Sequence, residues 1–418
     1  MMRCVWGILY NATLAVLLLG VRIVTPFFPK LRLRGQILRQ QKAKLESLAT
    51  ADERPTIWFH AASMGELEQI KPLVRLYRER LPSSRILVSV FSPSAYRQHR
   101  DLPCDALLLL PYDTPVAARR WVKVLQPTIA IVSRYDLWWN ITRQLHKRGI
   151  PLAIVNATFP STRWAPMLAG YYHLLYGHAK LIIARSERHA AAFQHLGIQS
   201  KIVVTPDTRI DQVATLAHAV TEPPAFLDHQ AFRLLLGSTW QADETLWLAA
   251  WQRLEPASKR SMQLIIVPHE PTPHHCMHLQ RELPGAVLLS QFNAPEHPAV
   301  VIVDRVGMLA RLYYHASAAY IGGGFGAGVH SLLEAAFAGI PLSCGPRIER
   351  SDDAQEFSEA GLLRVLTSPS EAIAWLDEVR NAPALRECAR SVQEQLHSLQ
   401  GVSVHVYRLI EQERELLT

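Results

Sequence analysis

An acidic residue that follows the first apolar run of the chain could act as a base. Glu66 ends the segment His60-Ala-Ala-Ser-Met-Gly-Glu66, which comes directly after the apolar residues 56–59. A helix is predicted from here toward Pro82, and the positive end of its dipole favours an ionised carboxylate. Such a carboxylate can take the proton from an attacking hydroxyl. Glu66 could instead only stabilise its helix, and His60 could be a hydrogen-bonded histidine without a catalytic part.

A glycine-rich stretch in the second half of the chain could bind an anion. Residues 319–341 predict a buried strand, a loop with Gly322, Gly323, Gly324, Gly326 and Gly328, and a helix that starts at about Ser331 and is closed by Gly339 and Pro341. Glycines let backbone N–H groups approach a ligand, and the helix start adds partial positive charge. Glu334, one turn into this helix, could accept hydrogen bonds from a sugar diol. The alternative is a tight strand-to-helix turn, whereas a dinucleotide fingerprint fits poorly because its acid should come roughly 20 residues further on.

Five other segments place polar side chains where apolar runs end. Arg134-Tyr-Asp-Leu-Trp-Trp-Asn140 suits an acceptor sugar, an acyl-chain rim or a packed helix start. Arg209, in Thr205–Asp211, could contact phosphate or carboxylate. Gly237, Ser238 and Thr239 open a small-residue turn that is a second candidate anion site. Pro268-His-Glu270 and Asp304–Met308 close two further runs.

Short apolar runs separated by helix-length polar stretches predict the scaffold for these residues. The runs form two series: 56–59, 86–91, 106–110, 129–132, 152–155 and 181–184, then 234–236, 264–267, 300–303, 320–321 and 341–343. Such runs indicate parallel sheets covered on both faces. The prediction is α/β, with two doubly wound Rossmann-like lobes, a linker at Thr221–Ala225 and ligand bound in a cleft between them. The last stretch, 384–418, is predicted to be helical and to brace the first lobe.

The N-terminal segment predicts a membrane anchor. Residues 5–21 are apolar apart from Asn11 and Thr13, which is close to the short limit for a membrane span. A basic cluster follows, at Lys30, Arg32, Arg34, Arg39, Lys42 and Lys44, and it suits anionic head groups. The positive-inside rule then places the body of the protein in the cytoplasm. The helix could span the membrane or lie in its interface, and a buried core helix is the alternative.

Composition narrows the remaining classes of partner. The net charge of +8 requires a negative partner, but the basic residues lie near the anchor rather than among aromatics, so nucleic-acid binding is not expected. Five scattered cysteines without a C-x-x-C pair favour a reducing compartment. His269, His274, His275 and His278 lie close together, but their proline-containing segment is predicted to be a loop with solvated histidines, and no metal site is expected.

An ordered set of motifs resembles one enzyme family. Behind the basic segment, HAASMGE, LPYDTP, RYDLWWN, DTRID, GSTW, PHE and GGGFGAGVHSLLEAAFAGIP are similar to motifs of the Kdo transferases, over nearly the whole chain. These lipid A glycosyltransferases move 3-deoxy-D-manno-octulosonic acid (Kdo) from CMP-Kdo. The resemblance implies a GT-B fold and an inverting reaction without metal or other cofactor. It also implies a lipid A precursor as acceptor, a role in lipopolysaccharide synthesis and a place at the cytoplasmic face of the inner membrane.

The resemblance also implies roles for particular residues. Glu66 matches the general base, and Asp136 and Arg209 match the acid and base that steady the transition state. The expected donor-binding residues are Gly237, Ser238, Thr239, Pro268, His269, Val306, Gly307, Met308, Gly324, Gly326, His330, Ser331, Leu332, Leu333 and Glu334. The expected acceptor-binding residues are Ser63, Gly65 and Arg134.

Four positions depart from the family pattern. Asp136 stands where the family usually has Glu, Pro206 replaces a glycine, Ser331 replaces Asn and Met308 replaces an acid. Proline removes a backbone donor and fixes φ. The alternatives are a GT-B enzyme that uses a UDP- or GDP-sugar and a scaffold that binds lipid A without catalysis. A sugar-nucleotide epimerase shares the two-lobed plan but has no obvious use for an anchor.

The predicted domain organisation has three parts. Residues 1–50 form the anchor and basic segment, residues 51–218 the acceptor-binding lobe, and residues 219–418 the CMP-sugar-binding lobe with the terminal helix.

Overall fold

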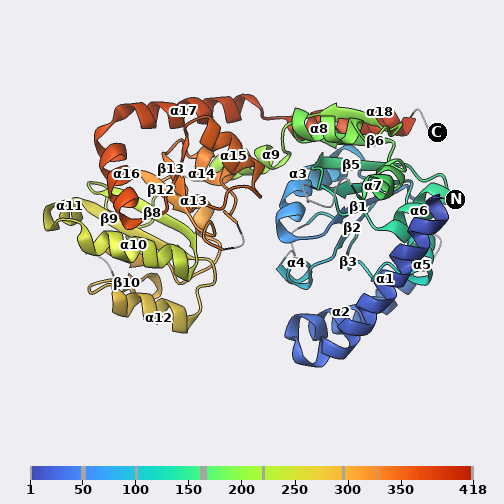
Figure 1. Cartoon of the computed structure of the whole chain (residues 1–418), viewed down its shortest axis with the longest axis horizontal. Helices are drawn as coiled ribbons and strands as arrows, with labels where there is room; N and C mark the ends of the chain where they lie inside the picture. Colours follow the sequence, from blue (N-terminus) through green and yellow to red (C-terminus); the bar gives the residue numbers. More distant parts are fainter. Residues whose placement is uncertain are drawn as a thin grey trace. The chain divides into compact units, whose positions relative to one another are not determined.

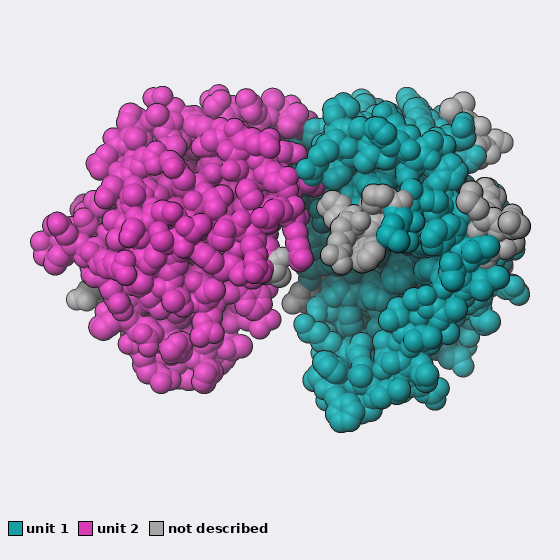
Figure 2. All heavy atoms as spheres, viewed as in Figure 1, with its two compact units in different colours: residues 1–212, 401–418 teal, residues 213–400 magenta. Residues whose placement is uncertain are grey.

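A computed structural model describes residues 2–48, 53–98, 102–160, 167–218, 222–293, 297–326 and 328–415. The chain divides into two compact units, residues 1–212 with 401–418 (unit 1) and residues 213–400 (unit 2) (Figure 2).

Unit 1 is built on a parallel sheet of seven strands in the order β3-β2-β1-β4-β5-β6-β7 (Figure 1). The strands are β1 (Thr56–Ala61), β2 (Arg85–Val90), β3 (Ala106–Leu109), β4 (Ile129–Ser133), β5 (Leu152–Ala157), β6 (Leu181–Ala184) and β7 (Lys201–Val204). The connecting helices are α3 (Met64–Arg80), α4 (Pro93–Gln98), α5 (Pro115–Leu125), α6 (Trp139–Lys147), α7 (Ala169–Tyr176), α8 (Glu187–Gln194) and α9 (Arg209–His218).

Side chains that alternate along β1, an inner strand, belong to two cores on opposite faces of this sheet. Ile57 and Phe59 belong to one buried cluster, and Trp58 belongs to the other. A strand buried on both faces must be apolar throughout, which explains the continuous runs in the sequence. The register pairs His60 with Ser89 on one side and with Val132 on the other. The residues that follow β1, β2 and β4 therefore meet at the edge of the sheet formed by the carboxyl ends of the strands.

The N-terminal helix packs on unit 1 through its first three turns. Helix α1 (Met2–Val24) is followed by a short turn η1 (Thr25–Phe27) and by α2 (Pro29–Leu48). The Tyr10 hydroxyl donates to the Asp113 carboxylate at 2.9 Å, and the side-chain amide of Asn140 donates to the side-chain oxygen of Asn11 at 2.8 Å. Many large apolar side chains of α1 remain exposed, Val16 at 71% among them. Among the described residues, one helical stretch, Val5–Phe27, is long and apolar enough to cross a membrane.

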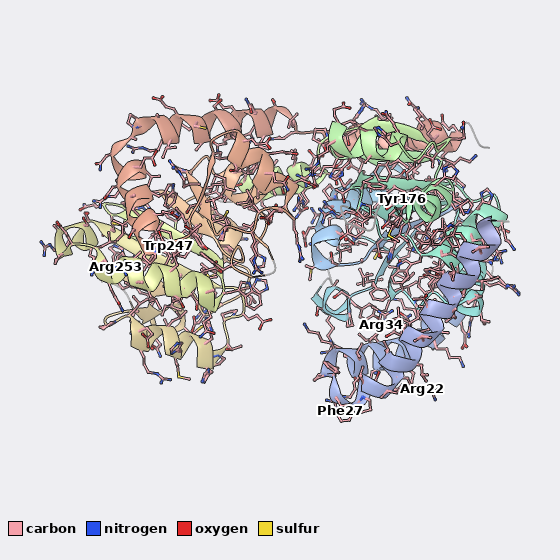
Figure 3. All side chains as sticks on the ribbon, in the orientation of Figure 1. Arg22, Phe27, Arg34, Tyr176, Trp247 and Arg253 are labelled. Carbon is pink, nitrogen blue, oxygen red and sulfur yellow. The ribbon has the colours of Figure 1, made fainter. Side chains whose placement is uncertain are left out.

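Helix α2 covers the edge strand β3 with polar contacts and buries Ile37 in the core. The Gln41 side chain donates to the Leu109 carbonyl at 2.7 Å and accepts from the Leu109 amide at 2.8 Å, as a neighbouring strand would. The Arg34 guanidinium donates to the carbonyls of Phe91 and Leu110 (Figure 3). These contacts satisfy backbone groups that an open sheet edge would leave unpaired.

Unit 2 contains a second parallel sheet of seven strands in the order β10-β11-β9-β8-β12-β13-β14. The strands are β8 (Phe232–Thr239), β9 (Met262–Pro268), β10 (Val287–Leu288), β11 (Val300–Ile302), β12 (Ala318–Ile321), β13 (Leu342–Cys344) and β14 (Leu363–Val365). The helices are α10 (Gln241–Arg253), α11 (Pro256–Arg260), α12 (Pro273–Glu282), α13 (Leu309–Tyr313), α14 (Leu333–Phe337), α15 (Asp352–Glu359), α16 (Pro369–Asn381) and α17 (Pro383–Ser398), with a short turn η2 (Leu289–Gln291). Trp247 of α10 is buried against Tyr320 of β12 and Trp375 of α16 (Figure 3).

The C-terminal helical region is two helices that belong to different units. Gly401, with φ of 90°, ends α17 and lets the chain turn into α18 (Val402–Glu415). Asp211 accepts from the amides of Gly401 and Ser403 at 2.7 Å, and α18 packs on α3, where the Tyr77 hydroxyl donates to Glu411 at 2.9 Å. The predicted brace on the first lobe is confirmed for α18, whereas α17 belongs to unit 2.

The domain limits in the structure differ from the predicted ones. The terminal helix was placed with the second lobe, but residues 401–418 belong to unit 1 because of the contacts of α18. The boundary lies after Gln212, within α9, rather than after residue 218. Residues 1–50 are not a separate unit. Of the predicted linker, Thr221 lies outside the described residues.

Candidate functional site

Glu66 lies where β1 passes into α3, and its carboxylate closes the first turn of that helix. One oxygen accepts from the amide of Ala62 at 2.5 Å and from that of Ser63 at 3.3 Å, while the Ser63 hydroxyl accepts from the Glu66 amide at 3.4 Å. This is a capping box, which satisfies otherwise unpaired donors at a helix start. The predicted structural role of Glu66 is therefore present. A Cβ added to the neighbouring Gly65 would meet no other atom within 4 Å.

Asp136 lies beside this helix start and is held by two donors. Its Oδ2 is 2.7 Å from His60 Nε2 and accepts from Trp138 Nε1 at 3.1 Å. The other ring nitrogen of His60, Nδ1, is 2.8 Å from the Ser89 hydroxyl, which also accepts from Trp58. His60 is thus hydrogen-bonded on both sides. We assign it to positioning Asp136, which agrees with the alternative considered from the sequence.

Arg134 follows β4 in a backbone conformation that is unusual for its side chain. Its φ is 61°, in the left-handed region, and its amide donates to the Val155 carbonyl at 2.9 Å. The Nε atom of Arg134 is buried and has no hydrogen-bond partner among the described residues. Strained residues of this kind concentrate at ligand sites. The strain and the unpaired donor support a ligand-binding part for Arg134.

The electrostatics of Glu66 differ from the prediction. Burial raises the pKa of its carboxyl, and the neighbouring Asp136 raises it further, while the Ala62 amide, Arg134 and His60 lower it. The net direction is upward. The helix start was expected to favour ionisation, but loss of water outweighs it. A raised pKa makes Glu66 a stronger base once it is ionised.

Arg209 opens α9 and is engaged by the acid two residues before it. Its Nε and Nη2 donate to Asp207 Oδ2 at 3.1 and 2.9 Å. Asp207 also accepts from Gln69, one turn beyond Glu66 on α3, at 2.8 Å. Burial raises the pKa of Asp207, but Arg209 and Arg185 lower it to about 2. In this structure Arg209 forms an ion pair with Asp207, and Asp207 ties the start of α9 to α3; the predicted contact of Arg209 with a phosphate stays a prediction.

In unit 2, three of the predicted segments meet in one aromatic stack. Trp240, His269 and His330 follow β8, β9 and β12, which are neighbours in the sheet. Ring centroids of His269 and His330 are 4.3 Å apart, those of Trp240 and His269 are 4.7 Å apart, and Trp240 Nε1 donates to His330 Nε2 at 2.9 Å. Burial and then His269 lower the pKa of His330 to about 4, so this histidine is neutral at physiological pH. Trp240 is 44% exposed and offers an aromatic face to a ligand.

The other donor-site candidates lie at the same edge of the sheet. Pro268 is the last residue of β9, and Gly237, Ser238 and Thr239 end β8. Ser238 has φ of 53° and Gly307 has φ of 87°, so both turns are tight. Val306 is 83% exposed, and Met308 precedes α13. The segments predicted to bind the donor are thus brought together within unit 2.

The glycine-rich loop uses most of its amides internally. Gly322 donates to Gly237, Gly323 donates to Asp243, Gly326 and Gly328 both donate to Gly323, and His330 donates to Gly322. An anion cradle would need these groups to face a ligand. The close backbone packing favours the alternative of a tight turn for this part of the loop. Ala327 lies outside the described residues.

The helix after this loop starts later than predicted. Helix α14 covers only Leu333–Phe337, and Leu332 is its cap residue, because the loop amides are already bonded to one another. Ser331 precedes it, and its hydroxyl donates to Glu334 at 2.6 Å. The Glu334 carboxylate is therefore partly engaged by its own turn.

Steric limits at two glycines give a prediction about the loop. A Cβ on Gly322 would lie 2.3 Å from the Ser238 carbonyl oxygen, whereas the nearest atom to a Cβ on Gly326 is 3.7 Å away. Gly322→Ala is therefore expected to destabilise unit 2 by about 1–3 kcal/mol, as overpacking does. Thermal denaturation should show a lower midpoint for Gly322→Ala, and Gly326→Ala is the matched control. Equal midpoints would contradict the packing argument.

The described residues contain no group of three or more His, Cys, Asp or Glu side chains that could hold a metal ion. The segment 273–282, predicted to be a loop, is helix α12, because Thr272 caps its start and Pro273 occupies the first turn. Its His275 Nε2 lies 2.9 Å from Glu244, whose Oε1 also accepts from Thr239.

Sequence reasoning missed several residues that hold the site together. Ser89 and Gln69 position His60 and Asp207, and Trp240 forms the unit 2 stack. Trp240 lies inside a segment that was singled out, so its aromatic side chain was an available signal. Ser89 and Gln69 gave none, because their partners are distant in sequence.

Comparison with known proteins shows which family the chain is similar to. Residues 35–212 match the family model described as 3-deoxy-D-manno-octulosonic-acid transferase (kdotransferase). A 3-deoxy-D-manno-octulosonic acid transferase from Chlamydophila psittaci is 26% identical over 329 residues, which cover 72% of each chain. One from Haemophilus influenzae is 24% identical over 364 residues, which cover 81% of this chain and 82% of the relative.

Solved structures give the fold. UDP-GlcNAc 2-epimerase from Neisseria meningitidis superposes with a TM-score of 0.61 at 14% identity and covers 85% of this chain and 100% of its own. The calicheamicin glycosyltransferase CalG4 superposes with a TM-score of 0.57 at 16% identity and covers 87% of this chain and 98% of its own. At these identities the likeness shows the fold alone, and it confirms the predicted GT-B type.

Proposed function

The chain is a glycosyltransferase related to the Kdo transferases of lipopolysaccharide biosynthesis, and we propose that it transfers Kdo from CMP-Kdo to the lipid A precursor lipid IVA. Glu66 is the general base that takes the proton from the acceptor hydroxyl. The observation that carries this proposal is the cluster at the edge of the unit 1 sheet, where buried Glu66 lies among Asp136, Arg134 and His60. An ionisable acid with an upward-shifted pKa at the carboxyl ends of parallel strands suits this task.

The other residues of the cluster act on charge and orientation. Asp136 and Arg209 steady the transition state, and Ser63, Gly65 and Arg134 contact the acceptor. Departure of a cytidylate requires little protonation, so one base and positive groups for the phosphate suffice, without a metal. In unit 2, the segments around Gly237, His269, Gly307 and His330 bind CMP-Kdo, and Trp240 provides an aromatic face for the donor.

The exposed apolar face of α1 and the basic residues after it support a position at the membrane. Since basic segments favour the cytoplasmic side, we assign the chain to the cytoplasmic face of the inner membrane. The acceptor is a lipid of that membrane.

The deciding experiment is mass spectrometry of the product. Purified full-length protein with CMP-Kdo and lipid IVA should yield a lipid heavier by the mass of Kdo. Parallel reactions with UDP- and GDP-sugars test the alternative donors, and product from these alone would reject the proposal. Absence of product with every donor would favour the non-catalytic scaffold.

The pH dependence of transfer gives a second prediction. Burial and Asp136 raise the pKa of Glu66, and a base must be deprotonated to act. We therefore expect kcat/KM to fall as the pH is lowered through a pKa above the about 4.3 of an unperturbed glutamate. The measurement is kcat/KM against pH in wild type and Glu66→Gln. An identical acid limb in the variant would assign the titration to another group.

A further inference from the structure

An open apolar groove lies on unit 1 between α1, α2 and α5. It has a volume of about 670 Å³ and lies within the size range of small-molecule sites, roughly 300–1,000 Å³. Leu18 of α1 contributes one wall, Leu38 and Leu45 of α2 a second, and Val116 and Val124 of α5 a third. The groove is therefore lined by aliphatic side chains from three helices.

Polar contacts and the buried Ile37 hold α2 in place, and the aliphatic side chains of the groove stay only partly buried. Gln41 and Arg34 fasten α2 to backbone atoms at the edge of β3, and Ile37 of α2 is buried in the core, whereas Leu38 and Leu45 remain half-buried. Val116 is 79% exposed at the start of α5. A concave set of half-buried and exposed aliphatic groups is unfavourable in water and is typical of a binding surface. The groove thus suits a ligand with an apolar chain.

Charged residues at the groove indicate which head group such a ligand carries. Arg39, Lys42 and Arg120 line the groove, and Glu46 is the acid near them, at 4.0 Å from Lys42 and 3.7 Å from Arg120. Three cations against one acid leave net positive charge. Exposed pairs of this kind are weak, so an anionic group can compete for these cations. The matching ligand is an amphiphile that combines an acyl chain with an anionic head.

Aromatic side chains connect this groove to the acid cluster. Tyr112 lines the groove, and its ring lies 6.3 Å from that of Phe91. Phe91 stacks on Trp138 at 4.9 Å, and Trp138 donates to Asp136 at 3.1 Å. These three rings, each partly exposed, follow β3, β2 and β4, and they form an aromatic strip along the same edge of the sheet as Glu66.

We propose that the groove binds a fatty-acyl chain of the acceptor glycolipid, while its anionic sugar head lies along the aromatic strip toward Glu66. This inference rests on the proposed function, since it names where the acceptor of that reaction is held. The groove would select for acylation, because a deacylated acceptor cannot bury a chain in it. The exposed face of α1, outside the groove, faces the bulk lipid.

The test fills the groove and compares two acceptors. Ala117→Trp places a large side chain on a residue that lines the groove, and Ala192→Trp makes the same change on α8, away from it. Wild type should prefer the acylated acceptor over its deacylated form by at least about tenfold in kcat/KM, the effect of a few buried methylenes. Ala117→Trp should lose most of this preference and leave the deacylated acceptor unchanged. Ala192→Trp should behave as wild type.

A second variant tests the groove with less risk to folding, and a second readout tests it without enzyme activity. Val116→Asp changes a side chain that is already exposed, so it should fold, and it should lower the preference in the same way. A lipid IVA analogue with a photoreactive group at the end of one acyl chain should crosslink to α2 or α5 in wild type and not in Ala117→Trp. This readout needs no turnover, so it tests the groove even if transfer itself fails.

Three outcomes would overturn the inference. Unchanged acyl preference in both groove variants would show that the chain is held elsewhere. Crosslinking to residues that do not line the groove would show the same directly. Lower binding of the variants to anionic phospholipid vesicles, with unchanged kcat/KM in detergent micelles, would assign the groove to bulk phospholipid instead.

Discussion

Replacement of Glu66 by glutamine is expected to lower the rate of Kdo transfer by about 10²–10⁴-fold, the range for loss of a general base. The amide cannot take a proton from the acceptor hydroxyl. It can still accept hydrogen bonds from the amides of Ala62 and Ser63, because glutamine also closes a capping box. The substitution therefore separates the catalytic role from the structural one.

The control for this variant lies two residues further along the same helix. Glu68 pairs with Lys71 at 2.6 Å, and its side chain is 33% exposed. Glu68→Gln should keep nearly full activity, since surface ion pairs contribute about 0–1 kcal/mol. The measurements are kcat with CMP-Kdo and lipid IVA and the thermal midpoint of each variant. Normal turnover by Glu66→Gln would remove Glu66 from the proposed role. Loss of activity together with a large fall in the thermal midpoint would mean that Glu66 acts mainly by capping α3 and not as a base.

Most of the sheet core could be predicted from the sequence for one physical reason. Strands buried on both faces must be apolar throughout, so runs such as 129–132 and 264–267 stand out from amphipathic helices, and both are strands in the structure. The short edge strands β10 and β14 were missed, because Val287–Leu288 and Leu363–Val365 are too short to show a pattern. The helix α12 was missed because its prolines and histidines suggested a loop, although Pro273 only starts it.

The sequence was enough to predict which residues gather at the candidate site, but it was not enough to predict which side chains are hydrogen-bonded to one another there. Residues after parallel strands gather at one edge, which is why Glu66, Arg134 and Asp136 were found together. Whether a side chain is paired can depend on a partner far away in sequence, as the hydrogen bond from Gln69 to Asp207 shows. The ionisation of Glu66 depends on burial, which only the folded chain defines.

Replacement of Asp207 by asparagine is expected to destabilise unit 1 by about 3 kcal/mol, the lower end of the cost of breaking a buried ion pair. Asp207 accepts from Gln69 at 2.8 Å and from the amide, Nε and Nη2 of Arg209. Asparagine offers one oxygen and turns an NH₂ group toward these donors. Arg209 would then keep its charge, with a side chain only 14% exposed, without its partner two residues away.

The same pair predicts how stability changes in acid. Because the pKa of Asp207 is lowered to about 2 in the folded state, its contribution is present above the unfolded value of about 3.9 and is lost as the pH falls toward 2. The loss amounts to about 2 kcal/mol. Urea midpoints should therefore fall more steeply from pH 4 to pH 2 in wild type than in Asp207→Asn. The control is Asp377→Asn on the exposed side of α16, which should follow wild type. Parallel curves for wild type and Asp207→Asn would show that the ion pair does not bear on the stability of unit 1.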